Sequence, residues 1–146
     1  MNSTLRYKIL EDCGLILEKF VGTINLSDMI VCVSKLFSDK KYDPNYLVLC
    51  DIRNANFVFN NNDLSKFIEF SHNAYHKFEV KENRFMALLA HTPKQTALAN
   101  LYSEKGFGIF GIFKVFSTEE AALDWLTLRN NTTIDTKVII SELNVL

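Results

Sequence analysis

The fold of this chain is decided by a short stretch near its C-terminal end, residues 113–126, which reads FKVFSTEEAALDWL. An apolar strand is expected over Ile112–Phe116. Ser117 and Glu120 follow it with the spacing of a capping box, which marks the start of a helix. A strand that leads directly into a capped helix is typical of alternating α/β folds.

The same unit, a strand followed by a helix, occurs twice more on the N-terminal side of this stretch. Short, nearly continuous apolar runs predict buried strands over residues 46–50 and 84–90. Helices are expected after them, over residues 63–78 and 93–105. Residues 51–62, which are polar and rich in asparagine, predict a loop between the first strand and its helix.

The chain begins with a predicted antiparallel hairpin. Its two strands are expected over residues 5–10 and 15–21, joined by a turn that ends in Gly14, and a helix follows from Ser27 to about Asp39. The resulting order is β-β-α-β-α-β-α-β-α. It predicts a single α/β domain with a mixed, mostly parallel sheet whose crossovers are right-handed.

The last residues differ in character from the predicted domain, which spans residues 1–129. Residues 130–133 form a polar break, and residues 138–146 are apolar again. We expect this C-terminal extension, residues 130–146, to add a strand to a sheet edge or to cross to a second subunit of a homodimer.

Composition excludes several classes of protein. The 146 residues are 48% hydrophobic and 23% charged, with a net charge of -1, so no footprint for nucleic acid or an anionic membrane is present. No apolar run approaches the roughly 18 residues of a membrane helix. The three cysteines form no CxxC pair, which indicates neither disulfides nor a zinc ribbon. We expect a cytoplasmic protein without a cofactor.

Three segments of the chain resemble the SpoIIAA-like branch of the STAS fold. They are YLVLCDIR at residues 46–53, RFMALLA at residues 84–90, and the stretch at residues 113–126. This family includes bacterial anti-sigma-factor antagonists and is grouped in some descriptions with lipid-binding domains of the Sec14 type. The resemblance implies a mixed α/β sheet and a regulatory module that binds a protein partner.

One departure from that family is visible at Asp51. Antagonists of this type carry a phosphorylatable Ser or Thr just after the aspartate that ends the strand. Here no hydroxyl residue occurs between Asp51 and Ser65, and Arg53 stands near the expected position instead. A switch based on serine phosphorylation is therefore not expected, whereas Arg53 resembles the SpoIIAA-like branch.

The carboxyl ends of the predicted parallel strands form the first candidate site, because ligands of open α/β sheets bind there. A small anionic ligand would also find backbone N–H groups at the helix that starts near Thr92. The alternative is structural, in which Asp51 and Arg53 simply pair with each other. The candidate ligand-binding residues are Asp51, Arg53, Asn54, His91, Thr92 and Lys94.

Phenylalanine is unusually frequent, with 12 residues, and four of them fall in predicted loops. Phe57, Phe59, Phe107 and Phe110 are candidates for lining an apolar pocket or an interface, the alternative being packing onto the core. The GxGxxG string at residues 106–111 lies between a helix and a strand, the reverse of the dinucleotide-binding order.

His72 and His76 are spaced to share a metal, but no further ligand pattern accompanies them, so no metal site is expected.

The leading hypothesis is a non-enzymatic, cytoplasmic, SpoIIAA-like module that regulates by binding a protein or a small ligand. Two alternatives remain open. One is binding of a lipid or another apolar small molecule, as in Sec14-type domains. The other is a small enzyme that uses Asp51 and His91 as an acid and base pair.

Overall fold

The computed structural model describes residues 4–78, 84–106, 111–129 and 133–146. A short 3-10 turn, Glu11–Cys13, joins the first two strands. The elements in chain order are β1 (Thr4–Leu10), β2 (Leu15–Ile24), α1 (Leu26–Phe37), β3 (Leu47–Phe57), α2 (Asn61–Tyr75), β4 (Phe85–Leu89), α3 (Pro93–Gly106), β5 (Ile112–Phe116), α4 (Glu119–Thr127) and α5 (Thr136–Asn144).

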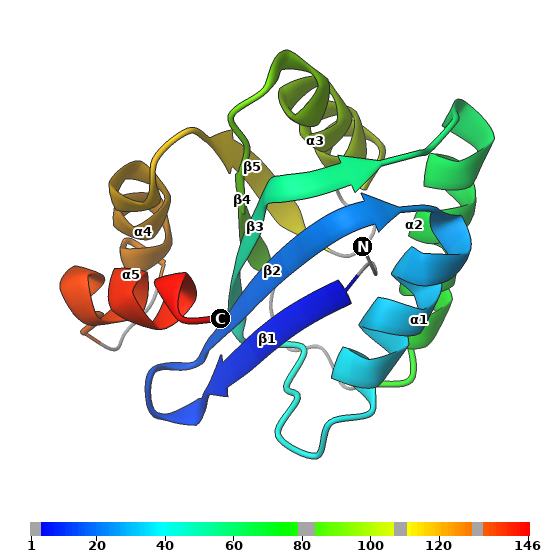
Figure 1. The fold of residues 1–146 in the computed structure, drawn as a ribbon. Helices are drawn as coiled ribbons and strands as arrows, with labels where there is room; N and C mark the ends of the chain where they lie inside the picture. The colour runs from blue at the N-terminus through cyan, green and yellow to red at the C-terminus, as the bar shows by residue number, and fades with distance from the viewer. Residues whose placement is uncertain (1–3, 79–83, 107–110, 130–132) are drawn as a thin grey trace.

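The strands form one mixed sheet with the order β1-β2-β3-β4-β5 (Figure 1). β1 is antiparallel to β2, and the remaining neighbours are parallel. This arrangement confirms the predicted fold class. The sequential strand order follows from the connections, since each parallel strand is reached through a helix that packs back onto the sheet.

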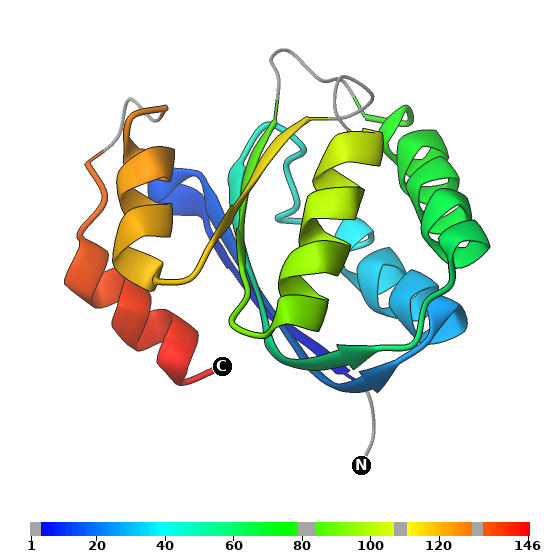
Figure 2. The same ribbon diagram turned by 90° about the horizontal axis from the view of Figure 1, so that it is seen from above.

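Helices cover both faces of the sheet (Figure 2). α1, α2 and α3 lie on one face, and α4 and α5 lie on the other. The alternation of side chains along β2 supplies both cores. Ile16 and Phe20 belong to the core under α1–α3, whereas Leu15 and Leu17 belong to the core under α4 and α5.

Local signals set the helix starts. Asn25 with Asp28 and Asn60 with Asp63 form complete capping boxes at α1 and α2. At α3 the predicted pair is confirmed, because the Thr92 hydroxyl accepts from the Gln95 N–H while the Gln95 side chain accepts from Thr92 N–H.

The predicted cap of α4 is wrong by one residue. Thr118, not Ser117, accepts the backbone N–H of Ala121. Ser117 and Thr118 both follow β5, and the side chain of either residue type can cap the start of a helix.

The loop predicted for residues 51–62 is also partly wrong, because β3 continues to Phe57. Along its second half Ala55 and Phe57 are buried, whereas Asn54 and Asn56 are exposed. The pattern therefore changes from a continuous apolar run to the alternation of a strand with one buried face. Asp51 pairs with Leu89 at the end of β4, so it lies within β3 rather than at its end.

The strand predicted for residues 138–146 is a helix, α5. Asp135 caps it by accepting the backbone N–H groups of Lys137 and Val138. Ile139 and Leu143, four residues apart, are buried on one face against the second core. A nine-residue amphipathic helix and a short apolar strand have similar compositions, and the helical spacing decides between them.

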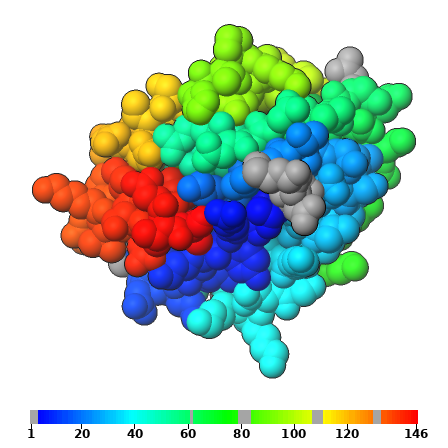
Figure 3. All heavy atoms as spheres, viewed as in Figure 1, coloured from blue at the N-terminus to red at the C-terminus, as the bar shows by residue number. Residues whose placement is uncertain are grey.

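The C-terminal helix also contacts the first strand of the sheet. Lys8 on β1 forms an ion pair with Glu142, and Arg6 donates a hydrogen bond to the carbonyl of Leu146. Figure 3 shows the C-terminal residues, in red, lying on the surface against the N-terminal strands, in blue. In this structure the tail therefore packs on its own chain.

Candidate functional site

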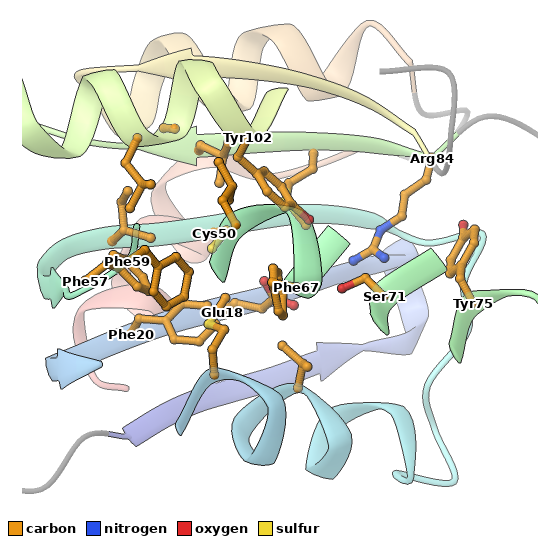
Figure 4. Close-up of a pocket in the computed structure, with 18 of the residues that line it drawn as sticks. Glu18, Phe20, Cys50, Phe57, Phe59, Phe67, Ser71, Tyr75, Arg84 and Tyr102 are labelled. Carbon is orange, nitrogen blue, oxygen red and sulfur yellow. The ribbon is translucent and has the colours of Figure 1, made fainter. Parts of the chain in front are cut away.

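A cavity of about 80 Å³ lies between the sheet and the three helices α1, α2 and α3. Its wall is mostly apolar and includes side chains from β2, β3 and β4 as well as from each helix. Figure 4 shows Phe57 and Phe59 at the end of the cavity opposite Arg84. The cavity thus has an aromatic end and a polar end.

The aromatic end is assembled by neighbouring strands. Phe20 on β2 and Phe57 on β3 face the same side of the sheet, and their rings meet edge to face at 5.9 Å between centroids. Phe59, just beyond β3, packs on Phe57 at 5.5 Å. Such tilted contacts are favourable for aromatic rings and hold the wall in a fixed shape.

The polar end contains two charged side chains that are almost fully buried, Glu18 and Arg84, each only 5% exposed. Glu18 lies on β2, and Arg84 directly precedes β4 and extends into the cavity (Figure 4). Within the described residues, no ion pair within 4 Å joins them. Their attraction therefore acts across a gap rather than through a direct contact.

Arg84 makes few contacts for a buried guanidinium. One terminal nitrogen lies 3.4 Å from the Tyr42 hydroxyl, a long hydrogen bond. The guanidinium carbon lies 5.6 Å from the centre of the Tyr75 ring. The Nε–H is buried and has no hydrogen-bond partner among the described residues. A buried charged donor without a partner is costly, which makes this group a candidate contact for a ligand.

Burial raises the pKa of Glu18, although the positive charge of Arg84 and a hydrogen bond with the Cys50 thiol act in the opposite direction. Burial and the neighbouring Glu18 carboxylate raise the pKa of Cys50 well above its ordinary value. This thiol is therefore protonated at neutral pH and chemically inert, as expected for a cysteine inside a strand.

Tyrosine hydroxyls complete the polar end. Burial raises the pKa of Tyr75 to about 12, and it raises the pKa of Tyr102 as well. Both remain protonated phenols at neutral pH. The Tyr75 hydroxyl donates to the carbonyl of Pro44 at 2.7 Å, and this bond fixes its ring beside Arg84.

Sequence reasoning missed Glu18 and Arg84 as site residues. The available signal was position, because Glu18 has the same parity along β2 as Ile16 and Phe20, both of which face the core under α1–α3. Arg84 begins the apolar run predicted over residues 84–90, and nothing in that run marks it as a site residue. Phe57 and Phe59, which were named as pocket candidates, line this cavity. Phe107 and Phe110 lie outside the described residues.

The site expected at the carboxyl ends of the strands is held together by its own ion pairs. The carboxylate of Asp51 accepts two hydrogen bonds from the Arg53 guanidinium, both at 2.9 Å. Arg53 also donates to Glu119 at 2.8 Å, which connects β3 with the start of α4. This geometry matches the structural alternative, in which Asp51 and Arg53 pair with each other.

Several other members of that candidate set form hydrogen bonds within the chain. The Lys94 ammonium donates to the Asn56 side chain at 2.8 Å. The Gln95 side chain accepts the backbone N–H groups of His91 and Thr92 and donates to the carbonyl of Arg53. The side chains of Asn54 and His91 are exposed, and no hydrogen bond or ion pair among the described residues joins Asp51 to His91.

We expect Arg53→Met to lower the free energy of unfolding at pH 7 by about 3 kcal/mol, because the buried Asp51 carboxylate loses its partner. Burial raises the pKa of Glu119, but the hydrogen bond from Arg53, a backbone hydrogen bond and the positive charge of Arg53 together outweigh it and hold that pKa below the ordinary 4.5. The stabilisation from the ionised Glu119 is thus present above pH 4.5, and it is lost as the pH falls through the lower pKa that Glu119 has in the folded protein.

Chemical denaturation at several pH values measures the free energy of unfolding of Arg53→Met. The difference in this free energy between the variant and wild type should become smaller at acidic pH. Lys94→Met, which removes an exposed cation on the same edge, is the control and changes stability by about 0.5 kcal/mol or less. Equal losses for the two variants would contradict a structural role for the Asp51–Arg53 pair.

The histidine pair forms no metal site in the part of the chain that the structure describes. His72 and His76 approach each other to 2.7 Å between their Nε2 atoms. Across the described ranges, no group of three or more His, Cys, Asp or Glu side chains is placed to hold a metal ion. None of the helices in those ranges is long and apolar enough to cross a membrane.

Comparison with solved structures defines the class of fold. An uncharacterized protein from the DUF3478 family, with a SpoIIAA-like fold, from Shewanella loihica PV-4, is similar to this chain with a TM-score of 0.57. The likeness covers 86% of this chain and 96% of that protein, at 19% sequence identity. This chain therefore has a SpoIIAA-like fold, as its sequence motifs predicted. No protein-family model and no curated protein matches it.

Proposed function

We propose that this SpoIIAA-like module binds a small, mostly apolar organic molecule in the cavity between the sheet and α1–α3. The observation that carries the proposal is an apolar cavity that contains, at one end, a buried arginine with an unpartnered N–H. Ligand sites in proteins are typically apolar with a few convergent polar groups, and this cavity has that character.

The size of the cavity defines the size of the ligand. At about 30 Å³ per water molecule, about 80 Å³ holds about three waters, or an organic molecule with about four to six non-hydrogen atoms. Typical sites for drug-sized ligands measure about 300–1,000 Å³. An acyl chain of a membrane lipid is too large for the cavity, so this volume favours a small molecule over a Sec14-like lipid.

The contacts at the other candidate site favour binding over catalysis. Asp51, the acid of the alternative enzyme hypothesis, is held by Arg53, and His91 is exposed on the loop before α3. In the proposed function, the protein acts as a receptor, and the small molecule bound in its cavity is the signal that it detects. A regulated protein partner, a homodimer and a cytoplasmic location stay predictions.

Filling the cavity tests the proposal. Ala99 on α3 lines the cavity and is buried, so Ala99→Leu is expected to occupy the space that a ligand needs. Nuclear magnetic resonance titrations with isobutanol, isobutyramide and isobutyrate should shift the signals of Met29 and Met86, which line the cavity, in wild type. In Ala99→Leu these shifts should disappear.

Ala121→Leu is the matched control, because Ala121 is exposed on α4, on the opposite face of the sheet. It should bind the probes as wild type does. If none of the three probes shifts the cavity signals of wild type, or if Ala99→Leu binds them unchanged, the proposed function is wrong. Native mass spectrometry of the purified protein provides a second measurement, since a retained small molecule adds a discrete mass.

A further inference from the structure

We propose that the ligand is a small carboxylic acid, bound as its carboxylate by the guanidinium of Arg84, with its hydrocarbon part directed toward Phe20 and Phe57. This inference rests on the proposed function and adds the chemical class of the ligand.

The hydrogen bonds of Arg84 leave a donor edge open. A guanidinium has five N–H donors, and its Nε–H lies along the same edge as one terminal N–H. That edge matches the two oxygens of a carboxylate and binds them with two parallel hydrogen bonds. Within the part of the chain that the structure describes, the Nε–H of Arg84 is buried without a partner, and its terminal nitrogen makes only a long hydrogen bond to Tyr42. A carboxylate in the cavity supplies the missing acceptor.

The charge of the cavity selects a monoanion. Among the described residues that line it, Arg84 is the only cation. A phosphate monoester carries close to two negative charges at pH 7 and would be left undercompensated in a buried site. A carboxylate carries one. With about four to six non-hydrogen atoms, the ligand is then a short branched or unbranched carboxylic acid.

Glu18 is the second charge in the cavity, and a bound carboxylate would repel its ionised form. The titratable groups that face Glu18 are Cys50 on β3, Arg84 before β4, Tyr42 before β3 and Tyr102 on α3. Only Arg84 among them is a cation, and the cavity-lining residues of α1 are apolar.

Burial already raises the pKa of Glu18, and a bound anion raises it further. Binding of the carboxylate is therefore coupled to uptake of one proton by Glu18. No bond is made or broken other than this protonation. The affinity accordingly falls as the pH rises above the pKa of Glu18 in the free protein.

Isobutyrate and isobutyramide test the proposal, because they have nearly the same shape and differ in charge. Titration followed by nuclear magnetic resonance at pH 6 should give wild-type protein an affinity for isobutyrate about tenfold or more above that for isobutyramide. Arg84→Met should lose this preference while keeping its weak affinity for the amide. Arg129→Met, which removes an exposed arginine that stacks on Trp125 outside the cavity, should behave as wild type.

Further variants test the two-point contact of Arg84 and the role of Glu18 separately. Arg84→Lys keeps the charge and the fold but lacks the paired donors, so it should lose most of the preference. Full preference in Arg84→Lys would overturn the two-point contact. Glu18→Gln should remove the decline in isobutyrate affinity with rising pH, and an unchanged decline would overturn the role of Glu18. Equal affinities for the two probes in wild type, or binding of isobutanol alone, overturn the inference alone, whereas binding of none of the three probes overturns the proposed function as well.

Discussion

Arg84→Met is expected to lower the free energy of unfolding at pH 7 by about 1–3 kcal/mol, less than the cost of breaking a buried ion pair in direct contact, because the buried Glu18 carboxylate loses the attraction of a positive charge that does not touch it. Glu18 would remain buried, with the thiol of Cys50 as its hydrogen-bond partner among the described residues. Methionine is similar in length to the apolar stem of arginine, so the loss measures charge rather than volume. Urea denaturation monitored by circular dichroism gives the value.

The pH dependence distinguishes this cause from a simple packing defect. Burial raises the pKa of Glu18 from its ordinary 4.5, and removal of Arg84 raises it further. The folded protein then binds more protons than the unfolded chain, so the stability of Arg84→Met declines as the pH rises from 4.5 through the folded-state pKa. The variant should therefore lie closest to wild type near pH 5.

A second substitution checks the same account. Glu18→Gln in the Arg84→Met background removes the uncompensated charge and should recover most of the lost stability at pH 7. If the double variant is no more stable than Arg84→Met, or if the loss is the same at pH 5 and pH 8, then the two side chains do not act through their charges. Should Arg84→Met fail to fold at pH 7, its folding at pH 5 would provide the same comparison.

Leu143→Ala is expected to lower the free energy of unfolding by about 2–5 kcal/mol, the usual cost of emptying a fully buried leucine site. Leu143 on α5 is 0% exposed and belongs to the core between the sheet and α4. The matched control is Leu128→Ala, since Leu128 is 83% exposed at the end of α4. That control should change stability by about 0.5 kcal/mol or less.

This comparison also tests how the last residues pack. Two equal and small effects would mean that α5 does not form part of the core in solution. In that case a role for residues 130–146 in contacts with a second copy would regain support. A large effect for Leu143→Ala that is independent of protein concentration is the result expected from packing on the same chain.

Strands and helices with strong local signals were predictable from the sequence. The first part of β3 and all of β4 are continuous apolar runs, which is the signature of strands buried on both faces. The Thr92 and Gln95 pair marked the start of α3 because capping depends on adjacent residues alone.

Other features depend on contacts with segments that are distant in the sequence, and local sequence patterns did not predict them. The end of β3 is defined by pairing with β2, which places Phe57 beside Ile24. α5 is helical because Ile139 and Leu143 find a core between α4 and the sheet. The sequence of a short apolar segment does not by itself decide between a strand and a helix.

The candidate site shows the same division. The pairing of Asp51 with Arg53 was foreseeable as an alternative, since the two residues are close in sequence. Glu18 and Arg84 are far apart in sequence, and charged residues in strands usually face solvent. Their burial becomes apparent only when α1, α2 and α3 are placed over that face of the sheet.

The cavity has a mechanical consequence for the folded protein. Unfolding eliminates internal voids, so the unfolded chain together with its solvent occupies a smaller volume, and hydrostatic pressure favours it. The space of about 80 Å³ under α1–α3 therefore contributes to the volume that the protein loses on unfolding under pressure. A ligand that fills the space makes the fold stiffer under pressure, in addition to any affinity it contributes.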